Sequence, residues 1–103
     1  MKDKAQIERA IEALKWEYSE LPQFSVFGDN NRAQRDARIG VLRLVIDLEY
    51  DDHKVRWLID EIYDSIRYDD ETQMAIGDDL YWVLDKRDDL DDTIKQFLES
   101  KEA

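Results

Sequence analysis

Two pairs of carboxylates have the helical spacing that can hold a divalent cation near a phosphate. Glu17 and Glu20 form one pair, and Glu61 and Asp64 form the other. Residues three apart lie on the same face of a helix, and hard cations such as Mg²⁺ take carboxylate oxygens as ligands. The two pairs are 44 residues apart, and a chain with 26 acids contains such spacings by chance. Metal-assisted hydrolysis is therefore only a remote alternative.

Other catalytic chemistry has no residues to support it. His53 is the single histidine, cysteine is absent, and the three glycines are isolated rather than grouped in a phosphate-binding loop. None of the serines stands in a Gly-x-Ser-x-Gly context, and no calcium-binding loop pattern occurs. We therefore expect no enzyme, no catalytic residue, no metal and no cofactor.

The remaining carboxylates favour binding. The chain has a net charge of −11, and residues 47–103 hold 19 acids against seven bases, whereas residues 1–20 and 21–46 are close to neutral. A field of this sign attracts basic protein surfaces and repels nucleic acid and anionic membranes. We expect a basic protein partner, such as a nucleic-acid-binding protein, and no direct contact with nucleic acid or membrane.

The candidate partner-binding residues are acids and tryptophans of this second half. The acids are Asp51, Asp52, Asp60, Glu61, Asp64, Asp69, Asp70, Asp78 and Asp79. Trp57 and Trp82 lie off the main apolar stripe on a helical wheel and have charged neighbours, as interface anchors often do. Trp16 also lies off its stripe. The alternative is that the three tryptophan rings close core edges or form the seam of a homodimer.

The apolar spacing predicts the helices that must position these residues. Steps of three and four predict five of them, at Asp3–Leu21, Arg32–Tyr50, Asp52–Arg67, Asp70–Lys86 and Asp89–Lys101. Aspartates precede several of these runs, where a carboxylate caps free N–H groups and opposes the helix dipole. The fold class is therefore all-α, a compact bundle of four to five short amphipathic helices. Residues 1–103 form a single helical domain.

The same pattern predicts which side chains face the core. Residues 32–50 have the widest apolar arc, including Leu44 and Leu48, so this helix should be the central one. In the next three helices the expected inward residues are Val55, Leu58, Ile59, Ile62, Ile66, Met74, Ile76, Leu80, Tyr81, Val83, Leu84, Leu90, Ile94, Phe97 and Leu98. The basic run from Arg32 to Arg43 should supply internal partners for the acidic helices.

Three local features remain open. The apolar loop with Phe24, Val26 and Phe27 should fold back on the core, and Asn30 or Asn31 should cap the following helix. The helices before and after Glu49–Lys54 could instead be continuous. Tyr50-Asp51-Asp52 recurs as Tyr68-Asp69-Asp70, which is either an internal duplication or an echo between amphipathic helices.

Composition indicates the cellular context. The absence of cysteine suits a reducing interior, the first residues are charged where a signal peptide is apolar, and no run approaches the ~18 apolar residues of a membrane span. We expect a cytoplasmic protein.

Part of the chain resembles a recurring sequence pattern. The segment Phe27-Gly-Asp-Asn-Asn-Arg-Ala33, followed by Asp36-Ala37-Arg-Ile39-Gly-Val41-Leu42, is similar to one in short uncharacterised helical proteins of bacteria and their phages. The resemblance covers residues 5–46. It implies a bacterial or mobile-element context and no activity or catalytic residues.

Together these features predict a non-enzymatic acidic protein-binding domain. Its specific form would be an inhibitor that imitates nucleic acid charge or neutralises a basic partner, as phages and mobile elements encode. One alternative is a structural or oligomerising helical protein. The remote alternative is an Mg²⁺-dependent nucleotide pyrophosphohydrolase.

Overall fold

The computed structural model describes residues 1–20 and 28–102, and these residues form five helices without strands. The helices are α1 (Lys4–Ser19), α2 (Gly28–Asp47), α3 (Asp52–Asp64), α4 (Asp70–Val83) and α5 (Asp89–Glu102). The all-α fold class is confirmed. None of the described helices has the length and apolar character needed to cross a membrane.

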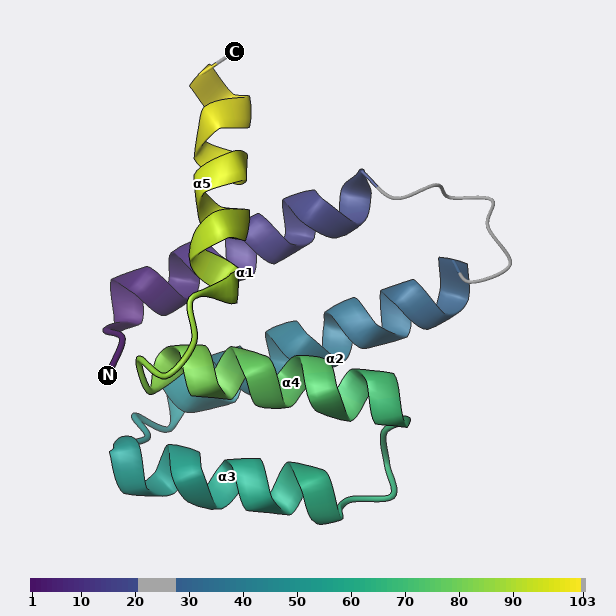
Figure 1. Cartoon of the computed structure of the whole chain (residues 1–103), viewed down its shortest axis with the longest axis vertical. Helices are drawn as coiled ribbons and strands as arrows, with labels where there is room; N and C mark the ends of the chain where they lie inside the picture. The colour runs from purple at the N-terminus through teal and green to yellow at the C-terminus, as the bar shows by residue number, and fades with distance from the viewer. Residues whose placement is uncertain (21–27, 103) are drawn as a thin grey trace.

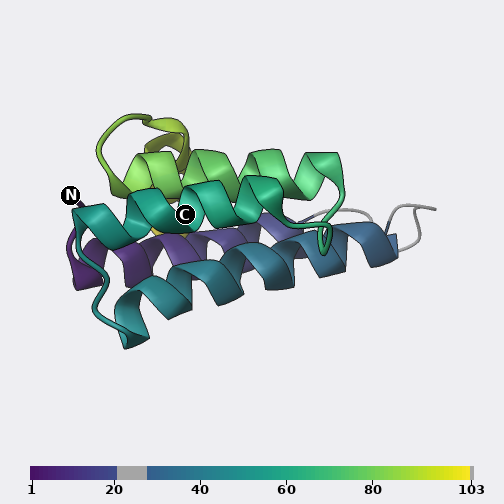
Figure 2. The same ribbon diagram turned by 90° about the horizontal axis from the view of Figure 1, so that it is seen from below.

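The helices form two layers and an upright fifth helix. Figure 2 shows α1 and α2 together in one layer and α3 and α4 in the next. The helix α4 packs on α2, on α3 and on α5, whereas α3 packs mainly on α4. Figure 1 shows α5 standing at a steep angle across α1, with its C-terminal end projecting beyond the layers.

The core is mostly aliphatic, with Trp82 and Phe97 as its buried aromatic side chains. Its most buried large side chains are Trp82, Leu14, Leu42, Ile76, Leu80, Val55 and Val83. Burial of a side chain of this size contributes about 1.5–3 kcal/mol, so these residues decide how the helices dock. Four of the seven come from α4 and its last turn.

Aspartate caps start three of the helices. The Asp3 carboxylate accepts a hydrogen bond from the Gln6 N–H at 2.8 Å, and the Gln6 side chain returns one to the Asp3 N–H in a capping box. Asp51 and Asp69 cap α3 and α4 in the same position. The expected role of the acids at these helix starts is confirmed.

Left-handed residues end α2 and α4. Glu49 has φ 51°, and the next residue's N–H reaches back to the Val45 carbonyl at 3.0 Å. Asp85 has φ 63°, and the Lys86 N–H likewise bonds the Tyr81 carbonyl at 2.8 Å. This pattern is the Schellman motif, here without the usual glycine. It ends α2 before α3 begins, so the two helices are not continuous.

Some sequence predictions about the helices are wrong. The predicted helix ends at Tyr50, Arg67 and Lys86 lie beyond the observed ends of α2, α3 and α4. The helix α2 starts at Gly28, so Asn30 and Asn31 lie inside it and do not precede it as caps. The predicted fold-back of Phe24, Val26 and Phe27 lies outside the described residues.

Several residues expected to face the core are exposed instead. They are Leu48, Ile66, Met74, Tyr81 and Leu98. Ile66 follows the end of α3, where the chain is no longer helical, so a helical wheel does not predict the direction of its side chain. Leu48 lies in the turn after α2, and Met74, Tyr81 and Leu98 lie on exposed faces of α4 and α5. The central helix is α4 rather than α2, because α4 has neighbours on three sides.

Candidate functional site

The outer crest of α3 carries an exposed tryptophan among carboxylates. Trp57 is 46 % exposed, as its place off the apolar stripe predicted. Asp60 and Glu61 follow it one turn later, where residues three and four apart become neighbours. The Lys54 ammonium lies 5.3 Å from the ring centroid, over one side of the indole. A large ring that remains in water beside charges is available to a partner.

Further carboxylates lie at the starts of α3 and α4. Asp51 and Asp69 accept hydrogen bonds from the Lys54 and Thr72 N–H groups, each at 2.8 Å, and Asp52 pairs with Arg56 at 2.7 Å. The pKa of Asp69 is lowered by its hydrogen bonds with Thr72, and the pKa of Asp52 is lowered by Arg56. Both groups therefore keep their negative charge well below neutral pH.

Asp78 lies farther along α4 and is only half exposed. The Arg87 guanidinium lies 3.6 Å from its carboxylate, which partly neutralises the charge. With this residue the exposed part of the predicted site is complete. We call it the acidic face; its residues are Asp51, Asp52, Trp57, Asp60, Glu61, Asp64, Asp69, Asp70 and Asp78.

Asp79 does not belong to this surface, so its predicted role in partner binding is wrong. Its side chain is buried and both carboxylate oxygens accept hydrogen bonds from the Arg38 guanidinium, each at 2.7 Å. Arg38 also donates to the Tyr18 hydroxyl at 3.1 Å. The pair joins α2 to the central helix α4. This contact confirms for Arg38 the expectation that the basic run supplies internal partners, whereas Arg35 pairs with Asp36 on its own helix.

Burial and pairing act in opposite directions on this pair. Removal from water raises the pKa of the Asp79 carboxyl, against the Arg38 hydrogen bonds that lower it. Burial lowers the pKa of Arg38, but its hydrogen bonds to Asp79 and Tyr18 outweigh that effect and raise it. A buried pair of this kind resists the loss of either partner, because the other charge would be stranded.

Trp82 is also part of the core, so its predicted role as an exposed anchor is wrong. It is 1 % exposed, its Nε1–H donates to the Asp91 carboxylate at 2.8 Å, and the Lys2 ammonium lies 5.3 Å from its ring. The sequence prediction assumed that this helix is buried along one apolar stripe only. In the structure α5 and the N-terminal segment cover the side of α4 from which Trp82 projects.

Trp16 makes an internal contact as well. Its ring lies 6.0 Å from that of Phe97, which connects α1 to α5. The half-buried indole therefore closes an edge of the core, as the alternative for the tryptophans stated. Of the three tryptophans, Trp57 alone is freely presented to solvent.

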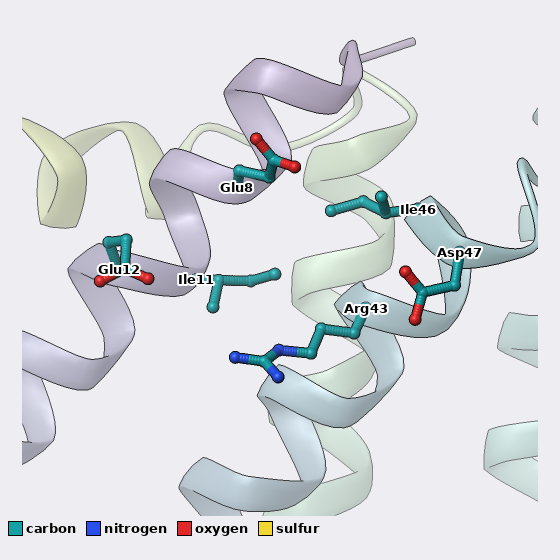
Figure 3. A pocket seen from close by; sticks show the side chains of 6 residues that line it. All are labelled: Glu8, Ile11, Glu12, Arg43, Ile46 and Asp47. Carbon is teal, nitrogen blue, oxygen red and sulfur yellow. The ribbon is translucent and has the colours of Figure 1, made fainter.

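A cleft between α1 and α2 was not predicted from the sequence. Figure 3 shows Glu8 and Glu12 on one side and Arg43 and Asp47 on the other, with isoleucines between them. The cleft has a volume of about 460 Å³. Both charged pairs have a spacing of four, which would have placed each on one helix face. Their mutual approach depends on helix packing, which the spacing does not specify.

The geometry of a metal site is not present in the described ranges 1–20 and 28–102. No group of three or more His, Cys, Asp or Glu side chains there could hold an ion. Glu61 and Asp64 do share one face, since both line a groove between α2 and α3. Their spacing prediction was therefore correct, although the other carboxylate pair is on α1.

Comparison with known proteins adds no relative. No protein-family model matches this chain, and no curated protein or solved structure matches it either. The resemblance of residues 5–46 to short bacterial and phage proteins stays a prediction. The function must be argued from the surface itself.

Proposed function

We propose that this chain is a non-enzymatic protein that binds a basic protein surface through its acidic face. The observation that carries the proposal is Trp57, a large ring 46 % exposed on the crest of α3 among carboxylates. Tryptophan in such a setting is a frequent centre of binding energy, while surrounding charges set orientation. The apolar ring would contribute affinity and the acids would select a basic partner.

The charge around Trp57 would also speed association. The second half of the chain holds 19 acids against seven bases. Electrostatic steering of this kind raises association rates by about 10- to 1000-fold at low ionic strength. The lowered pKa values of Asp52 and Asp69 keep these two carboxylates ionised in mildly acidic solution.

The specific role we propose is inhibition of a nucleic-acid-binding protein by occupation of its basic surface. The carboxylates are spread along α3 and the first turn of α4 rather than gathered at one point. A helix of 13 residues is about 20 Å long, which corresponds to about six base pairs of B-DNA, or little more than half of one helical turn. A partner that recognises a line of phosphates would find a line of carboxylates here.

The experiment compares two variants that carry the same change in charge. The immobilised chain should retain basic proteins from an extract at about 50 mM salt and release them by about 300 mM, since screening shortens the reach of charges. Replacement of Asp60, Glu61 and Asp64 by lysine should abolish this retention. Replacement of Glu8, Glu12 and Asp47 by lysine, at the cleft between α1 and α2, should leave most of it.

Three results would contradict the proposal. Retention of nothing basic at either salt concentration would remove its support, and equal losses in the two triple variants would reduce it to unspecific charge attraction. Trp57→Ala provides the third test, because it changes no charge. If that variant binds as the wild type does but no longer dimerises in light scattering, then the ring serves a homodimer instead.

A further inference from the structure

A groove runs between α2 and α3 beside the acidic face. It has a volume of about 380 Å³ and is lined by Val41 and Leu44 of α2, Leu58 and Ile62 of α3, and Tyr68 of the connection that follows α3. Leu44 and Tyr68 are only half-buried. The groove exists because α3 packs mainly on α4, so its other flank diverges from α2. Val41, Leu58 and Ile62 are buried, so the accessible apolar surface of the groove comes mainly from Leu44 and Tyr68.

One residue of α2 and one in the turn that follows it border this apolar surface. Leu48 lies one turn beyond Leu44 and is 58 % exposed. Gly40 lies one turn before it, and a Cβ at that position would have no neighbour within 4 Å among the described residues. By contrast, a Cβ at Gly77 would lie against the Tyr63 ring, so Gly77 has an internal reason to be glycine. Gly40 weakens α2 without such a reason and leaves room for a partner's backbone to approach.

The shape of the groove favours a helix as its occupant. Gly40 and Leu44 of α2 and Leu48 in the turn directly after it are spaced by four, and the Leu48 N–H still bonds the Leu44 carbonyl, so they form a ridge with the groove between it and α3. A second helix packs by placing its own ridge in such a groove, and small residues shorten the distance between axes. An amphipathic helix in an apolar groove is a common mode of peptide recognition.

The charged residues at the edge of the groove indicate that a bound partner would be positively charged. Two acids, Glu61 and Asp64, line the groove on the α3 side, and Arg67 is the one basic residue in its lining. Trp57 and Asp60 lie next to them on the crest. A helix in the groove would therefore place its flanking side chains beside an excess of carboxylates.

We infer that the groove between α2 and α3 binds an amphipathic helix of the partner, with apolar residues along one side and lysine or arginine at the flanks. The inference rests on the proposed function, because it specifies the part of a basic protein that would be held. The apolar stripe of the helix would lie against Leu44 and Leu48, with its backbone close to Gly40. Its basic flank would meet Glu61 and Asp64.

The test uses synthetic peptides and substitutions outside the core. The probe is an 18-residue peptide of leucine and lysine with all leucines on one helical face, labelled for fluorescence anisotropy. It should bind the full chain at least about ten-fold more tightly than a peptide of the same composition in scrambled order, because one apolar stripe then fits one groove. The double variant Gly40→Gln, Leu48→Gln should lose about ten-fold in affinity.

The matched control is Met74→Gln, which removes an equally exposed apolar side chain on α4. It should bind the peptide within about two-fold of the wild type, as expected for a surface change outside the contact. Glutamine is a better helix former than glycine, so the double variant should melt at or above the wild-type temperature. A loss of binding can then not be attributed to unfolding.

The outcomes separate this inference from the proposed function. Equal binding of ordered and scrambled peptides, an unaffected Gly40, Leu48 variant, or an equal loss in Met74→Gln would each overturn the groove. If the groove variant still retains basic proteins while the Asp60, Glu61, Asp64 variant does not, the inference fails and the proposed function stands. A wild-type dimer that Gly40→Gln makes monomeric would identify a second copy of the chain as the occupant.

Discussion

Helices α3 and α4 begin in the same way and then differ in burial. Asp51 caps the first and Asp69 the second, eighteen residues later, and at the same shift Glu61 corresponds to Asp79. Glu61 is exposed, whereas Asp79 is 2 % exposed and paired with Arg38. Matching sequences have thus produced one surface helix and one central helix.

The difference follows from the number of neighbours. The helix α3 packs mainly on α4, so roughly half of its circumference faces water and keeps a clear separation of apolar and polar residues. The helix α4 is enclosed by α2, α3 and α5, so its polar positions must either find partners or face a narrow exposed strip. An acid on α4 therefore stabilises the fold, while an acid on α3 remains available for recognition.

The largest difference in stability should be between variants of Trp57 and Trp82, for which the sequence predicted the same exposed position. Trp82→Ala should lower the free energy of unfolding by about 4 kcal/mol, because it opens a cavity in the core and removes the hydrogen bond to Asp91. Trp57→Ala should lower it by less than about 1 kcal/mol, because the ring is 46 % exposed. Urea unfolding followed by circular dichroism measures both.

Trp82→Phe guards against the case in which the alanine variant does not fold. It keeps most of the buried ring but cannot donate to Asp91, so a loss of about 1–2 kcal/mol is expected. Similar losses for Trp57→Ala and Trp82→Ala would show that α3 is packed as fully as α4. The comparison between the helices would then be wrong.

The next effect separates the two corresponding acids. Asp79→Ala should lower the free energy of unfolding by about 3 kcal/mol, because the largely buried Arg38 guanidinium loses its only carboxylate among the described residues. Glu61→Ala should change it by less than about 0.5 kcal/mol, since Glu61 is exposed. The same urea titration serves, with equal m-values as the sign that both variants unfold from the same native state.

A double variant tests the cause. Arg38→Met with Asp79→Leu replaces the pair by apolar side chains and should recover most of the loss, because no charge remains buried. If the double variant is as unstable as Asp79→Ala, the cost arises from packing and not from a stranded guanidinium.

These residues also show which parts of the fold and of the site could be predicted from the sequence. The helical periods and aspartate caps predicted the fold class and the start of α3, α4 and α5, because these depend on neighbours within a turn. The exposure of Trp57 followed from a single apolar stripe, which is a sufficient guide where a helix has one packed side. The burial of Asp79 and Trp82 could not be read in this way, because it depends on helices distant in sequence that enclose α4.

The groove between α2 and α3 could not be predicted from the sequence for the same reason. Leu44 and Leu48 stand on the stripe that predicted a central α2, and nothing local distinguishes them from core residues. Their exposure depends on which of α2 and α4 becomes the middle helix. The sequence of α4 contained one indication, since its apolar and polar residues are not separated to two sides, as is usual for a helix with several neighbours.

The smallest effect concerns the ends of the two helices. The chain leaves α3 at Ser65 in an extended conformation, but leaves α4 through left-handed Asp85, whose carboxylate pairs with Lys2 at 2.8 Å and with the N-terminal amine at 2.7 Å. The Lys2 hydrogen bond, followed by that of the amine, lowers the pKa of Asp85 to about 2. The charged form is therefore favoured by folding.

Since the pKa of Asp85 is lower in the folded chain, its contribution to stability is complete above about pH 4 and is lost as the pH falls toward 2. Asp85→Asn, which tolerates the left-handed conformation, should lower the melting temperature slightly at pH 6 and not at pH 2. Asp64→Asn at the end of α3 is the control and should show no such convergence. A constant difference between Asp85→Asn and wild type from pH 6 to pH 2 would mean that the backbone turn, not the ion pair, holds the end of α4.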